Sequence, residues 1–274
     1  MPGSFRQRVK RYLLRRSIDP VNINVVLEES ASGIACRIDD AISFSAPHAC
    51  RRELEHNATS FEGRAEFAAL LEAAAGPGGV LFDLGAHCGL ISSLWCAAKT
   101  GNRVCSFEPS PALVRRLAEI KELNQFNNRM VISQVGIGES NGVAAMLMDP
   151  VGGFVQTRHF DHSMWSAPES IEVSIETIEA ASARLGVVPD FIKIDIEGYE
   201  YEAIKGSASF LSKHRPVLFL ELHLNYLEQR KLSPKGVVEL LEQCGYSFFT
   251  YAGAKLSAGD VYGTPLAICH VVAK

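Results

Sequence analysis

The strongest constraint on the fold is a regular alternation of short apolar runs with amphipathic segments, which begins at Val80. Apolar runs of strand length occupy residues 80–84, 103–108, 130–135, 191–195, 216–222, 246–251 and 265–272. Segments with helical spacing of apolar residues lie between them, at residues 90–99, 111–124 and 234–244. Strands that alternate with helices form a mostly parallel sheet with helices on both faces. We therefore predict a doubly wound α/β fold.

The two ends of the chain depart from this alternation. Only residues 252–264 separate the last two apolar runs, which is too short for a crossover helix and predicts an antiparallel hairpin at one edge of the sheet. Before Gly76, short apolar runs with polar breaks indicate a small antiparallel element, followed by a helix that Gly76 closes. We divide the chain into a basic amphipathic helix (1–20), N-terminal strands with a helix (21–76) and the main domain (77–274).

Composition excludes several classes of protein. The 274 residues are 47% hydrophobic, which is enough for one large core, and a net charge of −4 leaves no basic surplus for a nucleic-acid partner. The seven cysteines lack C-x-x-C spacing and suit the reducing cytoplasm. No stretch reaches the ~18 apolar residues of a membrane span. We expect a cytoplasmic protein that is soluble or at most peripheral.

Residues 5–16 are an exception to the even charge, because they combine six basic side chains and no acid with apolar residues at helical spacing. One interpretation is peripheral contact with an anionic inner membrane surface or with an acidic partner. The other is a solvated helix that packs on its own domain.

The exit of the first predicted strand reads FDLGAHCGLISS, where Gly85 and Gly89 bracket a tight turn directly after Asp83. Glu108 ends the next strand, 23 residues after Gly85, where an acid can accept both ribose hydroxyls of a nucleoside. Ligands of such sheets bind at the carboxyl ends of the strands. These residues therefore predict a nucleoside-containing cofactor.

His87 discriminates between two such cofactors. A dinucleotide fingerprint places a glycine at this position so that the backbone can approach a pyrophosphate, and His87 would crowd that group. S-adenosylmethionine has no phosphate, so we favour it over NAD. A dehydrogenase remains the enzymatic alternative.

The chain also resembles the FkbM-type methyltransferases, a branch of the Rossmann-like class I enzymes that use S-adenosylmethionine. The segments FDLGAHCGLIS, FEPSPALVRRL, VGIGESNG, FIKIDIEGYE and PVLFLELH carry the likeness, over about residues 80–272. The resemblance implies O-methylation, often of a sugar hydroxyl in a glycan, a glycolipid or a glycosylated natural product. The family's usual T-L-D reads Thr177, Ile178 and Glu179 here, so Glu179 departs from the pattern.

The resemblance also implies the cofactor contacts. Asp83, Gly85 and Gly89 would line the methionine end, Glu108 would bind the ribose, and residues 134–139 would form the rim around the adenine. The complete set of expected cofactor-binding residues is Asp83, Gly85, Ala86, His87, Gly89, Glu108, Pro109, Gln134, Gly136 and Ile137.

The stretch FIKIDIEGYE predicts the reactive edge of the site. Strand periodicity places Asp195 and Glu197 on one side, and Gly198 then allows a turn into a helix that begins near Tyr199. Alternation along the following strand points Glu221 and His223 the same way. These four side chains are expected to converge beside the methyl donor.

Two chemistries remain open for these residues. Our first choice of general base is His223 with an ordinary pKa of about 6.5, oriented by Glu221 or Asp195, and the second choice is Asp195. The alternative is a divalent ion such as Mg²⁺ bound by the same oxygen-rich set, although we do not favour a metal. Lys193 lies inside the strand, where it either takes part in catalysis or pairs with a neighbouring acid.

Residues 149–168 lack periodicity and mix aromatic with polar side chains, which indicates a lid that binds a sugar-containing acceptor. A flap that packs its aromatic rings into the core is the alternative, and His159 with His162 is a weak candidate metal pair. A catalytically idle protein that binds S-adenosylmethionine is the non-enzymatic alternative for the whole chain.

Overall fold

The computed structural model describes residues 23–39, 42–148, 153–155, 169–264 and 268–274. The predicted basic helix within residues 1–20 lies outside these residues, as does most of the predicted lid, including His159 and His162. No helix in the described ranges has the length and apolar character needed to cross a membrane.

A central sheet of eight strands organises the molecule, in the order β14-β13-β15-β12-β11-β4-β5-β6. Five of its strands run parallel to one another: β4 (Val80–Leu84), β5 (Arg103–Phe107), β6 (Met130–Ser133), β11 (Phe191–Ile194) and β12 (Val217–His223). The predicted doubly wound parallel sheet is confirmed, since the apolar runs form these strands.

The antiparallel side of the sheet is formed by β13 (Phe248–Phe249), β14 (Lys255–Leu256) and β15 (Ile268–Ala273). The predicted antiparallel edge is confirmed, and the connection within it also contains β14 and the short helix α11 (Ala258–Tyr262). β15 lies between β12 and β13 and is antiparallel to both. Val271 and Ala273 of β15 are fully buried, which explains its interior position.

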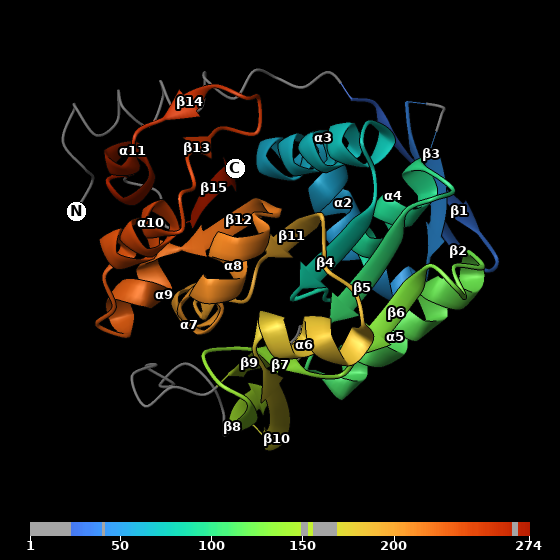
Figure 1. Ribbon diagram of the computed structural model, residues 1–274. Helices are drawn as coiled ribbons and strands as arrows, with labels where there is room; N and C mark the ends of the chain where they lie inside the picture. The colour runs from blue at the N-terminus through green and yellow to red at the C-terminus, as the bar shows by residue number, and fades with distance from the viewer. Residues whose placement is uncertain (1–22, 40–41, 149–152, 156–168, 265–267) are drawn as a thin grey trace, which may run out of the picture.

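Strand alternation divides the core between the two faces of the sheet. Leu81 and Val104 pack on one face with α3 (Phe61–Ala75) and α4 (Leu90–Ala98), while Phe82 packs on the other. Figure 1 shows helices on both faces of the sheet. The remaining helices of the domain are α5 (Pro111–Leu123), α6 (Ile178–Leu185), α7 (Glu200–Gly206), α8 (Ala208–His214), α9 (Leu224–Gln229) and α10 (Pro234–Gln243).

The N-terminal strands form a separate antiparallel sheet of β1 (Val25–Ser30), β2 (Gly33–Ile38) and β3 (Ile42–Ala46), as the sequence predicts. Helices η1 (His48–Cys50), α2 (Arg51–Thr59) and α3 follow, and α3 ends at Gly76 as expected. Ile34 and Phe44 of this sheet belong to the same apolar cluster as Leu81 of β4. The N-terminal segment and the domain therefore share one core.

Asn102 joins three parts of this core. Its fully buried side chain donates to the carbonyls of Ala74 (3.0 Å) and Trp95 (2.8 Å) and accepts from the backbone of Gly79 (3.1 Å). The end of α3, helix α4 and the approach to β4 are held together by one amide.

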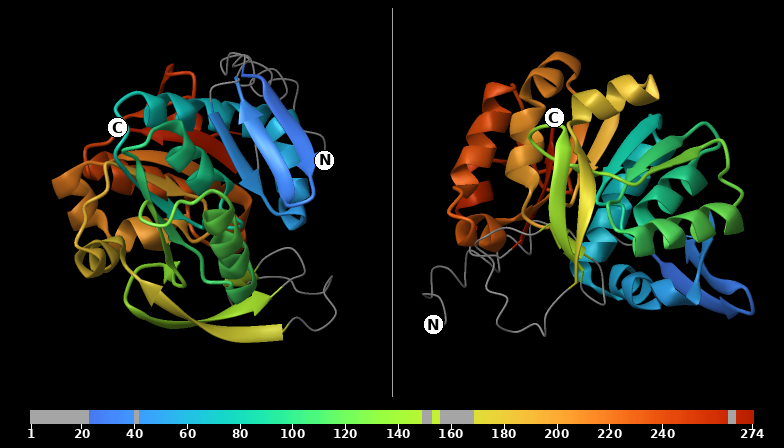
Figure 2. Two further views of the ribbon diagram at one scale, coloured as in Figure 1. Left: turned by 90° about the vertical axis from the view of Figure 1, so that its right-hand side faces the viewer. Right: turned by 90° about the horizontal axis from the view of Figure 1, so that it is seen from below.

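A second, smaller sheet was not predicted. It consists of β7 (Gly136–Ile137), β10 (Glu169–Glu176), β8 (Gly142–Met148) and β9 (Gly153–Val155), in that order. Figure 2 shows β8 and β10 as a long pair of strands that extends past the body of the domain. This sheet follows β6 in the chain and forms one wall of the cavity described below.

Candidate active site

The turn after β4 requires glycine at position 85. Gly85 has a φ of +79°, and a Cβ atom there would lie 1.8 Å from the carbonyl oxygen of Asp195. The backbone N–H groups of Gly85 and Ala86 both donate to the carbonyl of Phe107, at 3.0 Å. The turn is thereby fixed against both neighbouring strands, β5 and β11.

Gly89 lies at the start of α4, and its contact with the methionine end stays a prediction. It precedes α4 with a φ of +91°, and a Cβ atom there would lie 2.6 Å from the side chain of Leu117. Gly89 therefore allows close packing of the turn against α5, and it is absent from the cavity lining.

Asp83 is buried beneath the turn, with 1% of its surface exposed. One carboxylate oxygen accepts a hydrogen bond from Ser92 Oγ at 2.6 Å, and the other has no partner among the described residues. Burial raises the pKa of this carboxyl group. An unpaired buried oxygen of this kind suits a donor group of a bound ligand.

Glu108 presents an ordered carboxylate at the end of β5. Its two oxygens accept from the backbone N–H groups of His87 (2.9 Å) and Ser110 (2.8 Å). Because each carboxylate oxygen has two lone pairs, one acceptor position on each remains for a pair of hydroxyls. Burial raises the pKa of Glu108 to about 7.

A cavity of about 260 Å³ opens beside Glu108. Of the predicted cofactor residues, Gly85, Glu108, Pro109, Gly136 and Ile137 line it, whereas Asp83, Ala86, His87, Gly89 and Gln134 do not. Gly138 and Glu139, from the expected adenine rim at residues 134–139, also line it. The rest of the opposite wall comes mainly from the second sheet and was missed: Ser140, Gly142, Val143, Ala144, Met146 and Ile175. The apolar run at residues 143–147 was the available signal for this wall.

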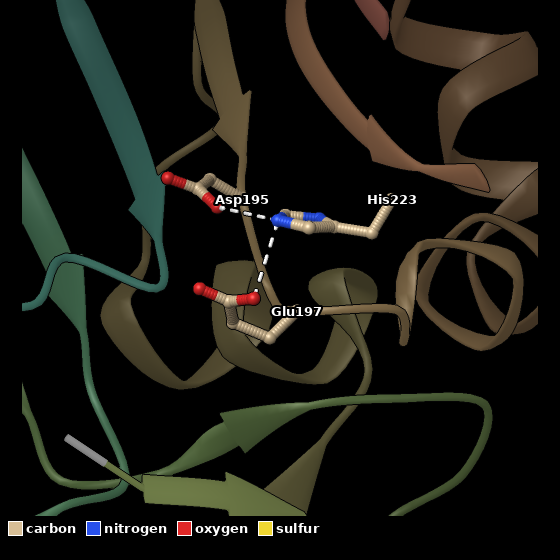
Figure 3. A group of neighbouring side chains, drawn as sticks. All are labelled: Asp195, Glu197 and His223. Carbon is tan, nitrogen blue, oxygen red and sulfur yellow. Dashed lines mark ion pairs between the residues drawn. The ribbon is translucent and has the colours of Figure 1, made fainter. Parts of the chain in front are cut away.

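The four predicted edge side chains, Asp195, Glu197, Glu221 and His223, do converge, and we call them the edge cluster. His223 Nε2 lies 3.2 Å from Glu197 Oε2, and 3.9 Å from both Asp195 Oδ1 and Glu221 Oε1. Figure 3 shows the carboxylates of Asp195 and Glu197 on either side of the same ring nitrogen. Glu197 also lines the cavity, so the cluster adjoins the expected cofactor site.

The backbone that positions Glu197 is a tight turn between β11 and α7. Glu197 (φ +54°) and Gly198 (φ +92°) are both left-handed, and a Cβ on Gly198 would lie 2.7 Å from Tyr226. Tyr226 in turn stacks on His223, with ring centroids 5.5 Å apart. The turn thus brings Glu197 back toward the His223 ring.

Glu200 fixes the His223 ring from the opposite side. This fully buried carboxylate lies 2.9 Å from His223 Nδ1 and accepts from the Gly198 backbone at 3.0 Å. Burial alone lowers the pKa of His223, but the bond to Glu200 and the nearby carboxylates outweigh it and raise the pKa to about 10. Our assumption of an ordinary pKa near 6.5 is therefore wrong, because the ring carries a proton at neutral pH.

The carboxyl groups of the cluster differ in their affinity for a proton. Partial burial and the charges of Asp195 and Glu221 raise the pKa of Glu197 to about 7. Burial also opposes ionisation of Glu221, but the contact of its Oε2 with His270 Nε2 at 3.3 Å outweighs this and lowers its pKa to about 2. Glu197 is the carboxylate whose pKa suits proton exchange near neutral pH.

Lys193 pairs with acids, which was one of the two predicted roles. Its buried Nζ donates to Asp195 Oδ2 at 2.7 Å and lies 3.4 Å from Glu66 Oε1 on α3.

Sequence reasoning missed both Glu66 and His270. His270 lies directly opposite Glu221 in the β12–β15 pair, a register that the sequence alone does not reveal. Glu179 is exposed in the first turn of α6, away from the cavity.

The fold and the site define a Rossmann-like α/β protein with a nucleoside-sized cavity at the carboxyl ends of its strands. Residues 83–248 match the model of the methyltransferase FkbM domain. The chain belongs to this family, so the dehydrogenase alternative is no longer favoured.

One curated relative is the hexuronic acid methyltransferase AglP of Haloferax volcanii, which is 24% identical over 168 residues. The match covers 61% of this chain and 63% of the relative. Among solved structures, an FkbM methyltransferase from Methylobacillus flagellatus has a TM-score of 0.46 and 17% identity, over 83% of this chain and 55% of that one. A precorrin-6y C5,15-methyltransferase from Geobacter metallireducens has a TM-score of 0.44 and 15% identity, over 86% of this chain and 94% of that one.

Proposed function

We propose that the protein is an S-adenosylmethionine-dependent O-methyltransferase that acts on a hydroxyl of a sugar-containing acceptor. Membership of the FkbM family supports methyl transfer, and the hexuronic acid methyltransferase among the relatives supports a sugar substrate. The observation that carries the proposal is the position of Glu197, which lines the cavity and contacts His223. Cofactor cavity and edge cluster are therefore adjacent.

The residues present fit this cofactor. Glu108 offers two free acceptor positions for vicinal ribose hydroxyls, and Pro109 with Ile137 provides apolar surface for an adenine ring. The unpaired oxygen of Asp83 lies beneath the turn that would hold the methionine end, outside the cavity lining. When bound, the cofactor would supply an activated methyl group, and the carboxylates of the edge cluster would favour its positive charge.

The chain's own residues would align the acceptor hydroxyl with the methyl donor and accept the proton of that hydroxyl. Alignment of two reactants can be worth ~7–11 kcal/mol, and a positioned base contributes ~10²–10⁴-fold. We assign the base to Glu197, since the His223 ring is already protonated at neutral pH. His223 holds the Glu197 carboxylate at 3.2 Å and is a positioning residue.

The test is methyl transfer from labelled S-adenosylmethionine to hexuronic-acid-containing glycans, with donor binding measured separately by calorimetry. Glu197→Gln should bind the donor and lose about 10²–10⁴-fold in turnover. Glu179→Gln is the matched control, because Glu179 is exposed and lies away from the cavity. Absence of donor binding by the wild type would refute the cofactor. Donor binding without transfer to any glycan would instead support the catalytically idle alternative.

A further inference from the structure

We propose that Asp195 Oδ1, Glu197 Oε2 and His223 Nε2 form a binding site for one divalent cation of the Mg²⁺ or Mn²⁺ type. The inference rests on the proposed function and deepens it. The cation would bind the acceptor hydroxyl at the border between the cavity and the edge cluster.

The distances suit a single ion. One ligand atom from each of the three residues lies within 4.8 Å of the other two. Nε2 is 3.2 Å from Glu197 Oε2 and 3.9 Å from Asp195 Oδ1. Octahedral ligands at about 2.1 Å from Mg²⁺ lie about 3 Å from their neighbours, so the three atoms need only a small movement to surround an ion.

The second, independent observation is the state of the buried His223 nitrogen. His223 is 2% exposed, and its Nε2 faces the carboxylates of Glu197 and Asp195 in ion pairs. Nδ1 is engaged by Glu200 at 2.9 Å, which directs Nε2 toward the two carboxylates. A buried ring nitrogen that is directed at two carboxylates suits a metal ligand once it is neutral, so the ion would displace the Nε2 proton that the ring carries in the metal-free protein.

The outer contacts of the ligands follow the pattern of protein metal sites. Ligating histidines usually bind a carboxylate through the other ring nitrogen, and ligating carboxylates are themselves held by hydrogen bonds. Glu200 is the carboxylate that binds the other ring nitrogen of His223. The Lys193 ammonium donates the hydrogen bond that holds Asp195, to its Oδ2 at 2.7 Å. The atoms that face the proposed ion are thus free of these outer contacts.

The three ligand atoms indicate which kind of ion the site would bind and what the ion would do in the reaction. Two carboxylates and one imidazole leave about three positions of an octahedral ion for water or substrate oxygens. Glu197 lines the cavity, so these positions would open toward it. Bound to the ion, an acceptor hydroxyl would have a lowered pKa, and two vicinal hydroxyls could chelate it. The ion would lower the pKa of the hydroxyl, and the second carboxylate oxygen of Glu197, which is not a ligand of the ion, would accept its proton.

The experiment uses the full chain after removal of metals by a chelator, with Mn²⁺ alone as the probe and no acceptor present. We expect electron paramagnetic resonance to show one bound Mn²⁺ per chain. Asp195→Asn and Glu197→Gln should each weaken Mn²⁺ binding at least about tenfold. Glu122→Gln on the exposed side of α5 is the matched control and should bind as the wild type does. Thermal unfolding confirms that each variant is folded.

Three outcomes would overturn the inference: no Mn²⁺ bound at millimolar concentrations, binding that both variants leave unchanged, or a methyl-transfer rate indifferent to chelator. A titration of the same metal-free protein with S-adenosylmethionine separates this result from the proposed function. Donor binding without Mn²⁺ binding removes only the cation site. Failure to bind the donor, with or without Mn²⁺, removes the proposed function as well.

Discussion

Glu108 makes nucleoside binding depend on pH in a direction that the structure fixes. Ribose hydroxyls donate hydrogen bonds, so they favour the ionised carboxylate, and its pKa in the free protein is about 7. The ionised fraction of Glu108 is then about 90% at pH 8 and about 10% at pH 6. Affinity should therefore fall about tenfold between pH 8 and pH 6, which corresponds to ~1.4 kcal/mol.

Adenosine is the appropriate ligand for this measurement, because it lacks the ionisable methionine end of the full cofactor. Calorimetric titration at pH 6, 7 and 8 gives the profile, and Glu108→Gln should show weaker binding with a flat profile. A wild-type affinity that is constant over this range would refute our account of Glu108. If the affinity of Glu108→Gln still depended on pH, the titrating group would be Glu197, the other carboxylate in the cavity wall with a pKa of about 7.

Three further predictions concern the scaffold of the site. Gly85→Ala should cost at least ~2 kcal/mol in urea unfolding, since a left-handed φ is strained for alanine and its Cβ would overlap the Asp195 carbonyl; unchanged stability would contradict this. Glu200→Gln removes the charge that holds the His223 proton, so the pKa of His223 measured by NMR should fall by at least about one unit, and a pKa equal to that of the wild type would exclude Glu200 as its cause. Asn102→Ala leaves three buried backbone groups without a hydrogen-bond partner and should lower the free energy of unfolding by ~2–5 kcal/mol; a loss well below this range would mean that water replaces the amide.

The sequence was most informative where function depends on strand geometry alone. Asp195 directly follows β11, and His223 is the last residue of the neighbouring parallel strand β12. The carboxyl ends of such strands meet at one edge, so the convergence of these residues could be predicted. The pKa of His223 could not be predicted, because it depends on Glu200, which a turn in the backbone brings to the opposite side of the ring. The sequence placed Glu200 in a first helical turn and gave no sign of that contact.

Other parts of the site come from segments that only the tertiary fold brings together. Glu66 reaches Lys193 from α3, more than a hundred residues earlier in the chain, and its apolar helix gave no indication of a buried ion pair. The cavity wall of β8 and β10 was not predicted, because unpatterned residues separate the two strands in the sequence. Pairing between distant strands is a property of the whole sheet, and local patterns determine it poorly.

The position of β15 has a consequence for biosynthesis. β12 and β13 are translated before β15, yet β15 lies between them and pairs with both. Until that strand leaves the ribosome, the nascent chain exposes two unsatisfied backbone edges to chaperones and to other nascent chains. His270 arrives with the same strand, so Glu221 of the edge cluster gains this histidine partner only when the sheet closes.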